Sequence, residues 1–143
     1  MSGIIHAVNF KLKATSDITD VVSTRIWYKV LPQNPTYPAL TFQEIDDLRY
    51  QTHDLYVGPA RARIQFDVWT ESKSESETLI EAVIDTFAPY RGSVALTGTS
   101  PLETVYIDAA IFEGMTEIPF EYESETILQE LFRKSADFTF WYR

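Results

Sequence analysis

The chain contains no cysteine and only two histidines among its 143 residues. Without cysteine it can form no disulfide, no thiolate metal site and no cysteine nucleophile. Its imidazoles, His6 and His53, are the side chains best suited to general base catalysis near neutral pH, but His53 has only a sequence neighbour, Asp54, where a catalytic triad needs a spatial arrangement. The sequence also lacks a Gly-x-Ser-x-Gly elbow, a glycine-rich phosphate loop and a His-Glu-x-x-His pair. The usual signatures of an enzyme are therefore missing.

Positive charge is scarce, with 12 Lys and Arg against 21 Asp and Glu and a net charge of −9. Nonspecific binding to DNA or to an anionic membrane depends on clustered Lys and Arg, so this balance argues against both. Between Gly92 and Phe132 there is no basic residue, while the same stretch contains Glu103, Asp108, Glu113, Glu117, Glu121, Glu123, Glu125 and Glu130. One part of the surface is expected to be strongly acidic, either as a solvated face or as a surface that repels DNA passing nearby.

No apolar run approaches the roughly 18 to 20 residues that cross a bilayer, and the N-terminus has no secretory signal. Apolar residues make up 45% of the chain and aromatic residues 14%, which is too hydrophobic for a disordered protein. A chain of this length buries roughly two-thirds of its unfolded surface in one core. We therefore expect a soluble, single domain over residues 1–143, made and used inside a cell, with no membrane partner.

Helical periodicity occurs in three places. Residues 3–13 form an amphipathic pattern that Ser2 can cap, and residues 17–22 resemble one more turn with Asp17 as its cap. The main helix is expected to begin at a capping box, Ser74-Glu75-Ser76-Glu77, and to end at Pro89. Its apolar residues recur at helical spacing and are Leu79, Ile80, Val83, Ile84 and Phe87.

Alternating residues predict five or six strands. They lie near 26–30, 39–44, 62–68, 94–96, 105–111 and 131–142. We expect the second strand to fade at Asp46-Asp47, a mobile loop over 48–59, and Gly114 and Pro119 to end the fifth. Residues 127–132 fit a helical turn or a strand. With the main helix after the third of these strands, the order predicts an α+β fold, a mostly antiparallel sheet with about two helices packed on one face and the other face partly open.

Several surface residues are candidates for contacts with other chains. Arg61 and Arg63 share the polar face of a strand and can pair with acids of a neighbouring chain, while Asp46 and Asp47 point to opposite faces of an extended segment. The expected loop adds His53, Asp54 and Tyr56 as a contact surface. Glu121, Glu123 and Glu125 alternate, which favours an acidic edge facing solvent or a partner over a metal site, since no EF-hand pattern is present. The tryptophans are expected in the core or in subunit contacts, because a base-stacking platform also needs a basic groove.

Three short motifs in fixed order carry a resemblance to a known family. They are Leu31-Pro32-Gln33-Asn34-Pro35-Thr36-Tyr37-Pro38, in which proline excludes a helix or central strand, then Gln65-Phe66-Asp67-Val68-Trp69, and finally Asp137-Phe138-Thr139-Phe140-Trp141-Tyr142. With the N-terminal helix and the long central helix, this order resembles the phage tail-completion family, whose members are also called tail terminators or tail-to-head joining proteins.

The resemblance implies a structural virion protein rather than an enzyme, with no cofactor or metal. Such proteins form a ring, typically of about six copies, through heterologous contacts at the head-proximal end of the tail tube. The implied partners are other copies of the chain, the tail tube protein and a head connector or head-completion protein, with DNA passing through unbound. Glu117, Glu121, Glu123 and Glu125 would then line the lumen or rim. The alternatives are another head–tail junction or tail-tube subunit, and an acidic DNA-mimicking interaction protein.

Overall fold

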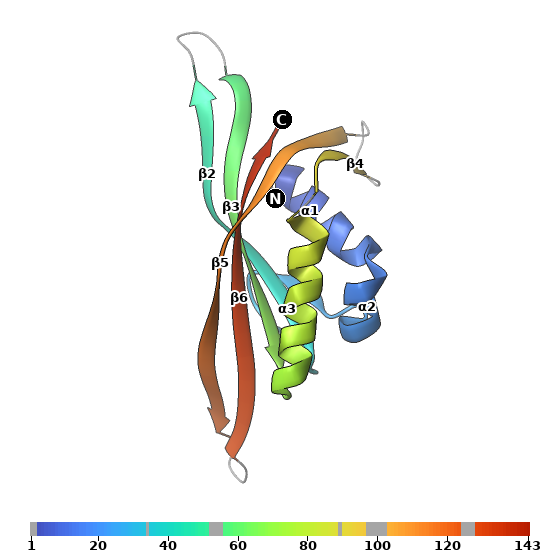
Figure 1. Cartoon of the computed structure of the whole chain (residues 1–143), viewed down its shortest axis with the longest axis vertical. Coiled ribbons are helices and arrows are strands. Elements are labelled where there is room, and N and C mark those ends of the chain that lie inside the picture. Colours follow the sequence, from blue (N-terminus) through green and yellow to red (C-terminus); the bar gives the residue numbers. More distant parts are fainter. Residues whose placement is uncertain (1–2, 34, 52–55, 89, 97–102, 124–127) are drawn as a thin grey trace.

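The protein is a curled six-stranded sheet with its helices packed on one face (Figure 1). The computed structural model describes residues 3–33, 35–51, 56–88, 90–96, 103–123 and 128–143. Its elements are α1 (Gly3–Ala14), α2 (Ser16–Val22), β1 (Ile26–Tyr28), β2 (Ala39–Gln51), β3 (Tyr56–Thr70), α3 (Lys73–Phe87), β4 (Gly92–Leu96), β5 (Glu103–Glu123) and β6 (Leu128–Tyr142). The α+β prediction is confirmed, with the turn expected at residues 17–22 forming a short third helix. Within the described residues, no helix is long and apolar enough to cross a membrane.

The strand order is β1-β2-β3-β6-β5-β4, and every neighbouring pair is antiparallel except β1 and β2. A parallel pair needs a connection that carries the chain back to the other end of the sheet. The proline segment at residues 31–38 makes this connection without forming helix or strand in its described residues, and Tyr37–Pro38 is a cis peptide. The crossing role predicted for this segment is therefore confirmed.

The core lies between the two central strands and α3. As predicted, the inward residues of β3 are fully buried, and they are Ala62, Ile64, Phe66 and Val68. Phe66 stands at the centre, with its ring centroid 5.0 Å from that of Phe87 on α3 and 5.7 Å from that of Phe138 on β6. Burial of aromatic and aliphatic side chains supplies most of the favourable free energy of such a fold. The helices are thus held by the sheet, as their periodicity predicts.

Two of the three predicted helix caps were placed wrongly, and the third, Ser2, lies outside the described residues. The N-cap of α2 is Thr15 rather than Asp17, and the N-cap of α3 is Ser72 rather than Ser74. Neither cap residue makes a side-chain capping bond. The Thr15 hydroxyl instead donates to the carbonyl of Lys11, because α1 ends directly before α2. Packing of the apolar face onto the sheet, rather than a capping box, sets where α3 begins.

The prediction that β2 fades at Asp46-Asp47 and is followed by a mobile loop over 48–59 was also wrong. β2 continues to Gln51 and pairs with β3, which begins at Tyr56. A register shift between Glu44 and Asp46 leaves Ile45 as the extra residue of a bulge, and pairing resumes beyond it. A bulge lets a strand bend and continue where simple alternation fails.

Bulges also explain why β5 does not end at Gly114 or Pro119, as was expected from the sequence. Its register shifts between Ile107 and Ala109, and again between Phe112 and Gly114, while pairing with β6 continues to Glu123. The first shift reverses the predicted alternation, so that Ala110 is buried and Ile111 is exposed. β6 begins at Leu128, which settles the ambiguous stretch in favour of a strand from that residue on.

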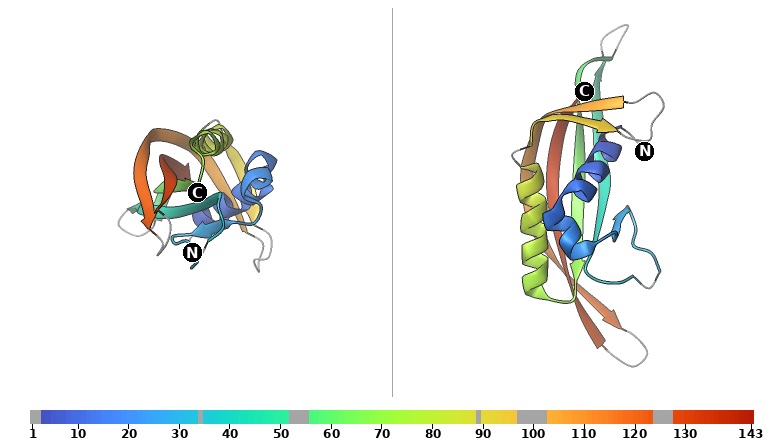
Figure 2. Two further views of the ribbon diagram at one scale, coloured as in Figure 1. Left: turned by 90° about the horizontal axis from the view of Figure 1, so that it is seen from below. Right: turned by 90° about the vertical axis from the view of Figure 1, so that its right-hand side faces the viewer.

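Two hairpins extend beyond the body at opposite ends of the long axis (Figures 1 and 2). Pairing between β3 and β6 covers residues 60–70 and 132–142 only. The described residues of β3 before residue 60 pair only with β2, and those of β6 before residue 132 pair only with β5. We call residues 49–51 and 56–59 the β2–β3 arm, and residues 120–123 and 128–131 the β5–β6 arm.

Candidate interaction surface

The sheet face turned away from the helices, called the open face below, brings predicted contact residues from separate strands together. A hollow of ≈360 Å³ on this face is lined by Asp46 of β2, Arg61 and Arg63 of β3, Thr139 of β6 and Glu113 of β5. Strand register explains this grouping, because Asp46, Arg63 and Thr139 are direct neighbours across three strands. The sequence indicates Asp46, Arg61 and Arg63 as candidates for contacts with other chains, and the structure places the three side by side.

Each of the two arginines already has an acidic partner within the chain. The Nη2 atom of Arg61 lies 3.7 Å from Oδ2 of Asp46, and the Nη2 atom of Arg63 lies 3.0 Å from Oδ2 of Asp137. The Arg61 guanidinium also lies 6.0 Å from the ring centroid of Trp141. All four charged side chains remain partly exposed, so water screens these pairs and leaves the arginines accessible to a further acidic group.

We expect the Arg63–Asp137 pair to contribute little to folding. A double-mutant cycle of Arg63→Ala and Asp137→Ala should give a coupling free energy of about 0.2–1 kcal/mol, because the two side chains are 49% and 29% exposed. Urea denaturation of the four proteins measures this coupling. A value of several kcal/mol would show that the pair is a major stabilising contact rather than an available surface.

The neighbouring acids Asp46 and Asp47 point to opposite faces, as predicted. Asp46 faces the hollow, whereas Oδ1 of Asp47 accepts a hydrogen bond of 3.1 Å from the hydroxyl of Tyr142. Tyr142 is buried on the helix side of β6. Asp47 therefore ties β2 to the last strand residue, and only Asp46 belongs to the open face.

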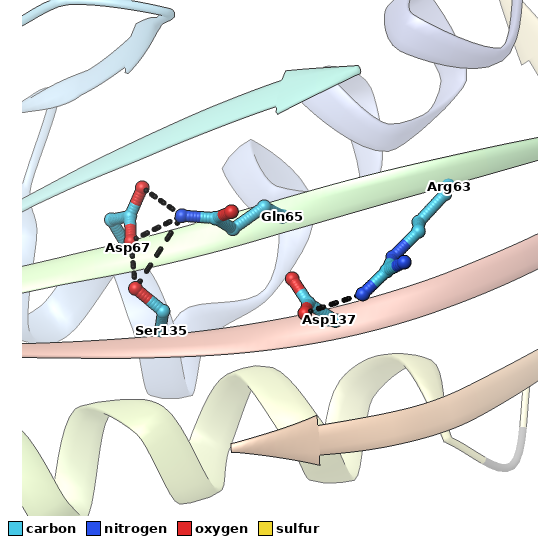
Figure 3. A network of polar contacts seen from close by, with 5 residues as sticks. All are labelled: Arg63, Gln65, Asp67, Ser135 and Asp137. Atoms are coloured by element: carbon cyan, nitrogen blue, oxygen red, sulfur yellow. Dashed lines mark hydrogen bonds and ion pairs between the residues drawn. The ribbon is translucent and has the colours of Figure 1, made fainter. Parts of the chain in front are cut away.

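A second polar group on the open face was missed by the sequence analysis (Figure 3). Asp67, only 3% exposed, accepts hydrogen bonds from Ser135 and from Nε2 of Gln65, the latter at 3.0 Å. The Nη2 atom of Arg133 lies 3.4 Å from Oδ1 of Asp67, and its guanidinium stacks 4.6 Å from the ring centroid of Trp69. The alternating pattern places Asp67 on the polar face of β3 with Arg61 and Arg63, but no sequence signal places Arg133 and Ser135 opposite it. This network joins β3 to β6 and is a structural element of the face.

The remaining predicted residues are only partly described. His53, Asp54 and Glu125 lie outside the described residues, and so do the side chains of Tyr56, Glu121 and Glu123, whose backbones belong to β3 and β5. Glu117 is exposed and pairs in register with Lys134, whose Nζ atom lies 3.7 Å from Oε1 of Glu77 on α3. Glu117 therefore lies on the helix side of β5. In the described part of the chain, no group of three or more His, Asp or Glu side chains is arranged to hold a metal ion.

Large apolar side chains are exposed on the two outer strands of the main antiparallel sheet. On β2 they are Ile45 and Leu48, and on β5 beyond its pairing with β4 they are Ile111, Phe112 and Met115, all between 40% and 49% exposed. β2 pairs with β1 only over Leu40–Phe42, and β5 pairs with β4 only over Glu103–Ile107. Beyond those short pairings, the outer edges of both strands have no partner strand in the described residues. We refer to residues 43–48 as the β2 edge and residues 109–117 as the β5 edge.

Comparison with known proteins identifies a family and a similar fold. Residues 6–108 match the model of the family described as Tail completion protein gp17. Among solved structures, the fold is similar to a chain in the virion of a native gene transfer agent particle, with a TM-score of 0.61 and 15% sequence identity over 94% of this chain and 90% of that chain. No curated protein matches the sequence. Since the family match covers well over half of the chain, this protein belongs to the tail completion protein gp17 family and is a structural component of the phage tail.

Proposed function

We propose that copies of this chain form a closed ring of about six copies at the head-proximal end of the tail tube, where the ring stops tube growth and joins the tail to the head. Membership of a tail completion family supports a position at the end of the tail. The observation that carries the proposal is the pair of arms at opposite ends of the long axis. A ring whose axis follows that direction has two unlike faces, one for the tube and one for the head.

The arms differ in charge, which suits two different partners. The β5–β6 arm belongs to the stretch from Gly92 to Phe132 that has no Lys or Arg, whereas the β2–β3 arm and its connection contain Arg49, His53 and Asp54. Tyr56 opens β3 at the same end. In the proposed assembly the β2–β3 arm docks onto the tube protein or onto the head connector or head-completion protein. This role rests on positioning and contact and requires no catalytic step.

The acidic residues of the β5–β6 side have a defined role in this assembly. Glu117, Glu121, Glu123 and Glu125 line the lumen or its rim, where their charge repels the phosphates of DNA that passes without binding. Reversing these charges with Glu→Lys substitutions would then slow DNA passage by creating phosphate contacts. Variants that assemble into particles and eject DNA at the normal rate would contradict the lumen assignment.

Deleting the gene from the parent phage tests the proposed function. Electron microscopy of the lysate should show DNA-filled heads beside unattached tails, many of them of uncontrolled length, with infectivity lost. A plasmid copy of the gene should restore normal particles and serves as the control. Normal infectious particles without the gene would refute the structural role, and empty heads beside tails of normal length would place the protein in head completion instead.

A further inference from the structure

The β2 edge and the β5 edge are sheet edges that have no partner strand in the described residues. Backbone amides and carbonyls of an edge strand that has no partner depend on water, and exposed apolar side chains beside them favour association. Native edge strands are commonly protected by charges, bulges or proline. The β2 edge and the β5 edge contain bulges, yet each exposes apolar side chains next to its bulge, namely Ile45 and Leu48 on one and Ile111, Phe112 and Met115 on the other.

The positions of these edges suit a head-to-tail contact. They lie on opposite sides of the four central strands, in the order β2-β3-β6-β5. Three successive antiparallel pairings make β2 and β5 run in opposite directions. When a second copy of the same orientation is placed beside the first, its β2 therefore lies antiparallel to the β5 of its neighbour. Each copy then uses each edge once, as a heterologous closed ring requires.

Charge also differs between the two sides. Glu113 is exposed on the β5 edge and forms no ion pair with another described residue. On the other side, the partly exposed Arg61 and Arg63 occupy β3, one strand inside the β2 edge. Paired strands are spaced about 4.8 Å apart, so with β2 of a neighbouring copy next to β5, the neighbour's β3 would lie about 10 Å from β5. A glutamate on β5 and an arginine on that β3 can together span this distance.

We propose that the β5 edge of one copy packs against the β2 edge of the next. The contact joins Ile111, Phe112 and Met115 to Ile45 and Leu48 of the neighbour, and it brings Glu113 toward the neighbour's Arg61 and Arg63. Because bulges interrupt both edges, backbone hydrogen bonds between the two strands are limited to short stretches, and side-chain packing supplies the rest of the contact. This proposal names the interface of the proposed ring and rests on that ring.

Cysteine cross-linking tests the contact directly, because the natural chain has no cysteine to interfere. Leu48→Cys and Ile111→Cys, which both lie on the open face and differ by two residues in strand register, are prepared as single variants and as a double variant, and are treated with a short bifunctional maleimide. An equimolar mixture of the single variants should give covalent dimers, each single variant alone should give none, and the double variant should give a ladder up to the full ring. Phe10→Cys, an exposed position on α1, is the control and should not cross-link.

Failure of this interface is distinguishable from failure of the ring. Cross-linking of Leu48→Cys to itself would show a two-fold contact and overturn the proposal. Absence of the mixed cross-link both in solution and in purified tails, while electron microscopy shows wild-type rings, would overturn the interface and leave the ring intact. Normal infectivity after gene deletion would refute the proposed function whatever the cross-links show.

Charged substitutions provide an independent measurement. Leu48→Glu and Met115→Glu should each abolish rings without lowering the melting temperature of the monomer. In a mixture, the intact β5 edge of Leu48→Glu can still pack against the intact β2 edge of Met115→Glu. The two edges left over each carry the new glutamate, whose burial is unfavourable, so native mass spectrometry should detect only 1:1 dimers. Full rings from either variant alone would overturn the proposed contact.

Discussion

Replacing Phe66 by alanine should lower the free energy of unfolding by about 3–5 kcal/mol. Phe66 is fully buried and stands among four other aromatic rings, with centroid distances of 5.0 Å to Phe87, 5.7 Å to Phe138 and 6.4 Å to both Phe42 and Phe140. These rings come from β2, β6 and α3, so the cavity left by the substitution weakens contacts between the sheet and its main helix. Urea denaturation followed by circular dichroism measures the loss.

Phe112→Ala is the matched control for this substitution. Phe112 also contacts Phe138, at a centroid distance of 5.4 Å, but is 40% exposed. Its removal should cost about 1 kcal/mol or less in the monomer, because part of its surface stays in water and the site can collapse. Equal losses for the two variants would contradict the assignment of Phe66 to the centre of the core.

The central strands could be predicted because burial there follows a simple period of two. On β3 and β6 the inward residues are apolar at nearly every second position, and the structure confirms both faces. The edge strands departed from this rule. Ile45 in β2 and Glu113 in β5 lie where the register shifts, and each shift changes which residues face inward. A bulge has no distinctive side-chain signature here, so the predictions ended both strands too early.

The candidate interaction surface could likewise be predicted only in part. Arg61 and Arg63 could be placed together because they share one face of a strand, whereas the register that brings Asp46 beside them could not be predicted. The exposed apolar residues of the β5 edge could not, because Ile111 was expected to share the buried face of Val105 and Ile107. This edge is identified only by the strand pairing. In the described residues, the outer side of β5 has no partner strand from residue 109 on. The β2 edge was missed because the second strand was expected to fade at Asp46-Asp47.

Replacing Asp67 by alanine should lower the free energy of unfolding by about 3 kcal/mol. The Asp67 carboxylate is almost completely buried, and it accepts hydrogen bonds from Gln65 and Ser135 while pairing with Arg133. Alanine would leave the hydroxyl of Ser135 without its acceptor and Arg133 without its counter-charge. The Nε atom of Arg133 already has no hydrogen-bond partner among the described residues, so the arginine depends strongly on this one carboxylate. Urea denaturation measures the loss.

A pair of further variants separates the cost of an orphaned charge from the value of the pair itself. Arg133→Met keeps an unbranched stem over the ring of Trp69, and combined with Asp67→Leu it removes both charges together. Because replacing both partners of a buried ion pair with apolar groups is often close to neutral, the double variant should recover most of the stability that Asp67→Ala loses. If the double variant is as unstable as Asp67→Ala, the hydrogen bonds to Gln65 and Ser135, rather than the charge of Arg133, hold β3 and β6 together on the open face.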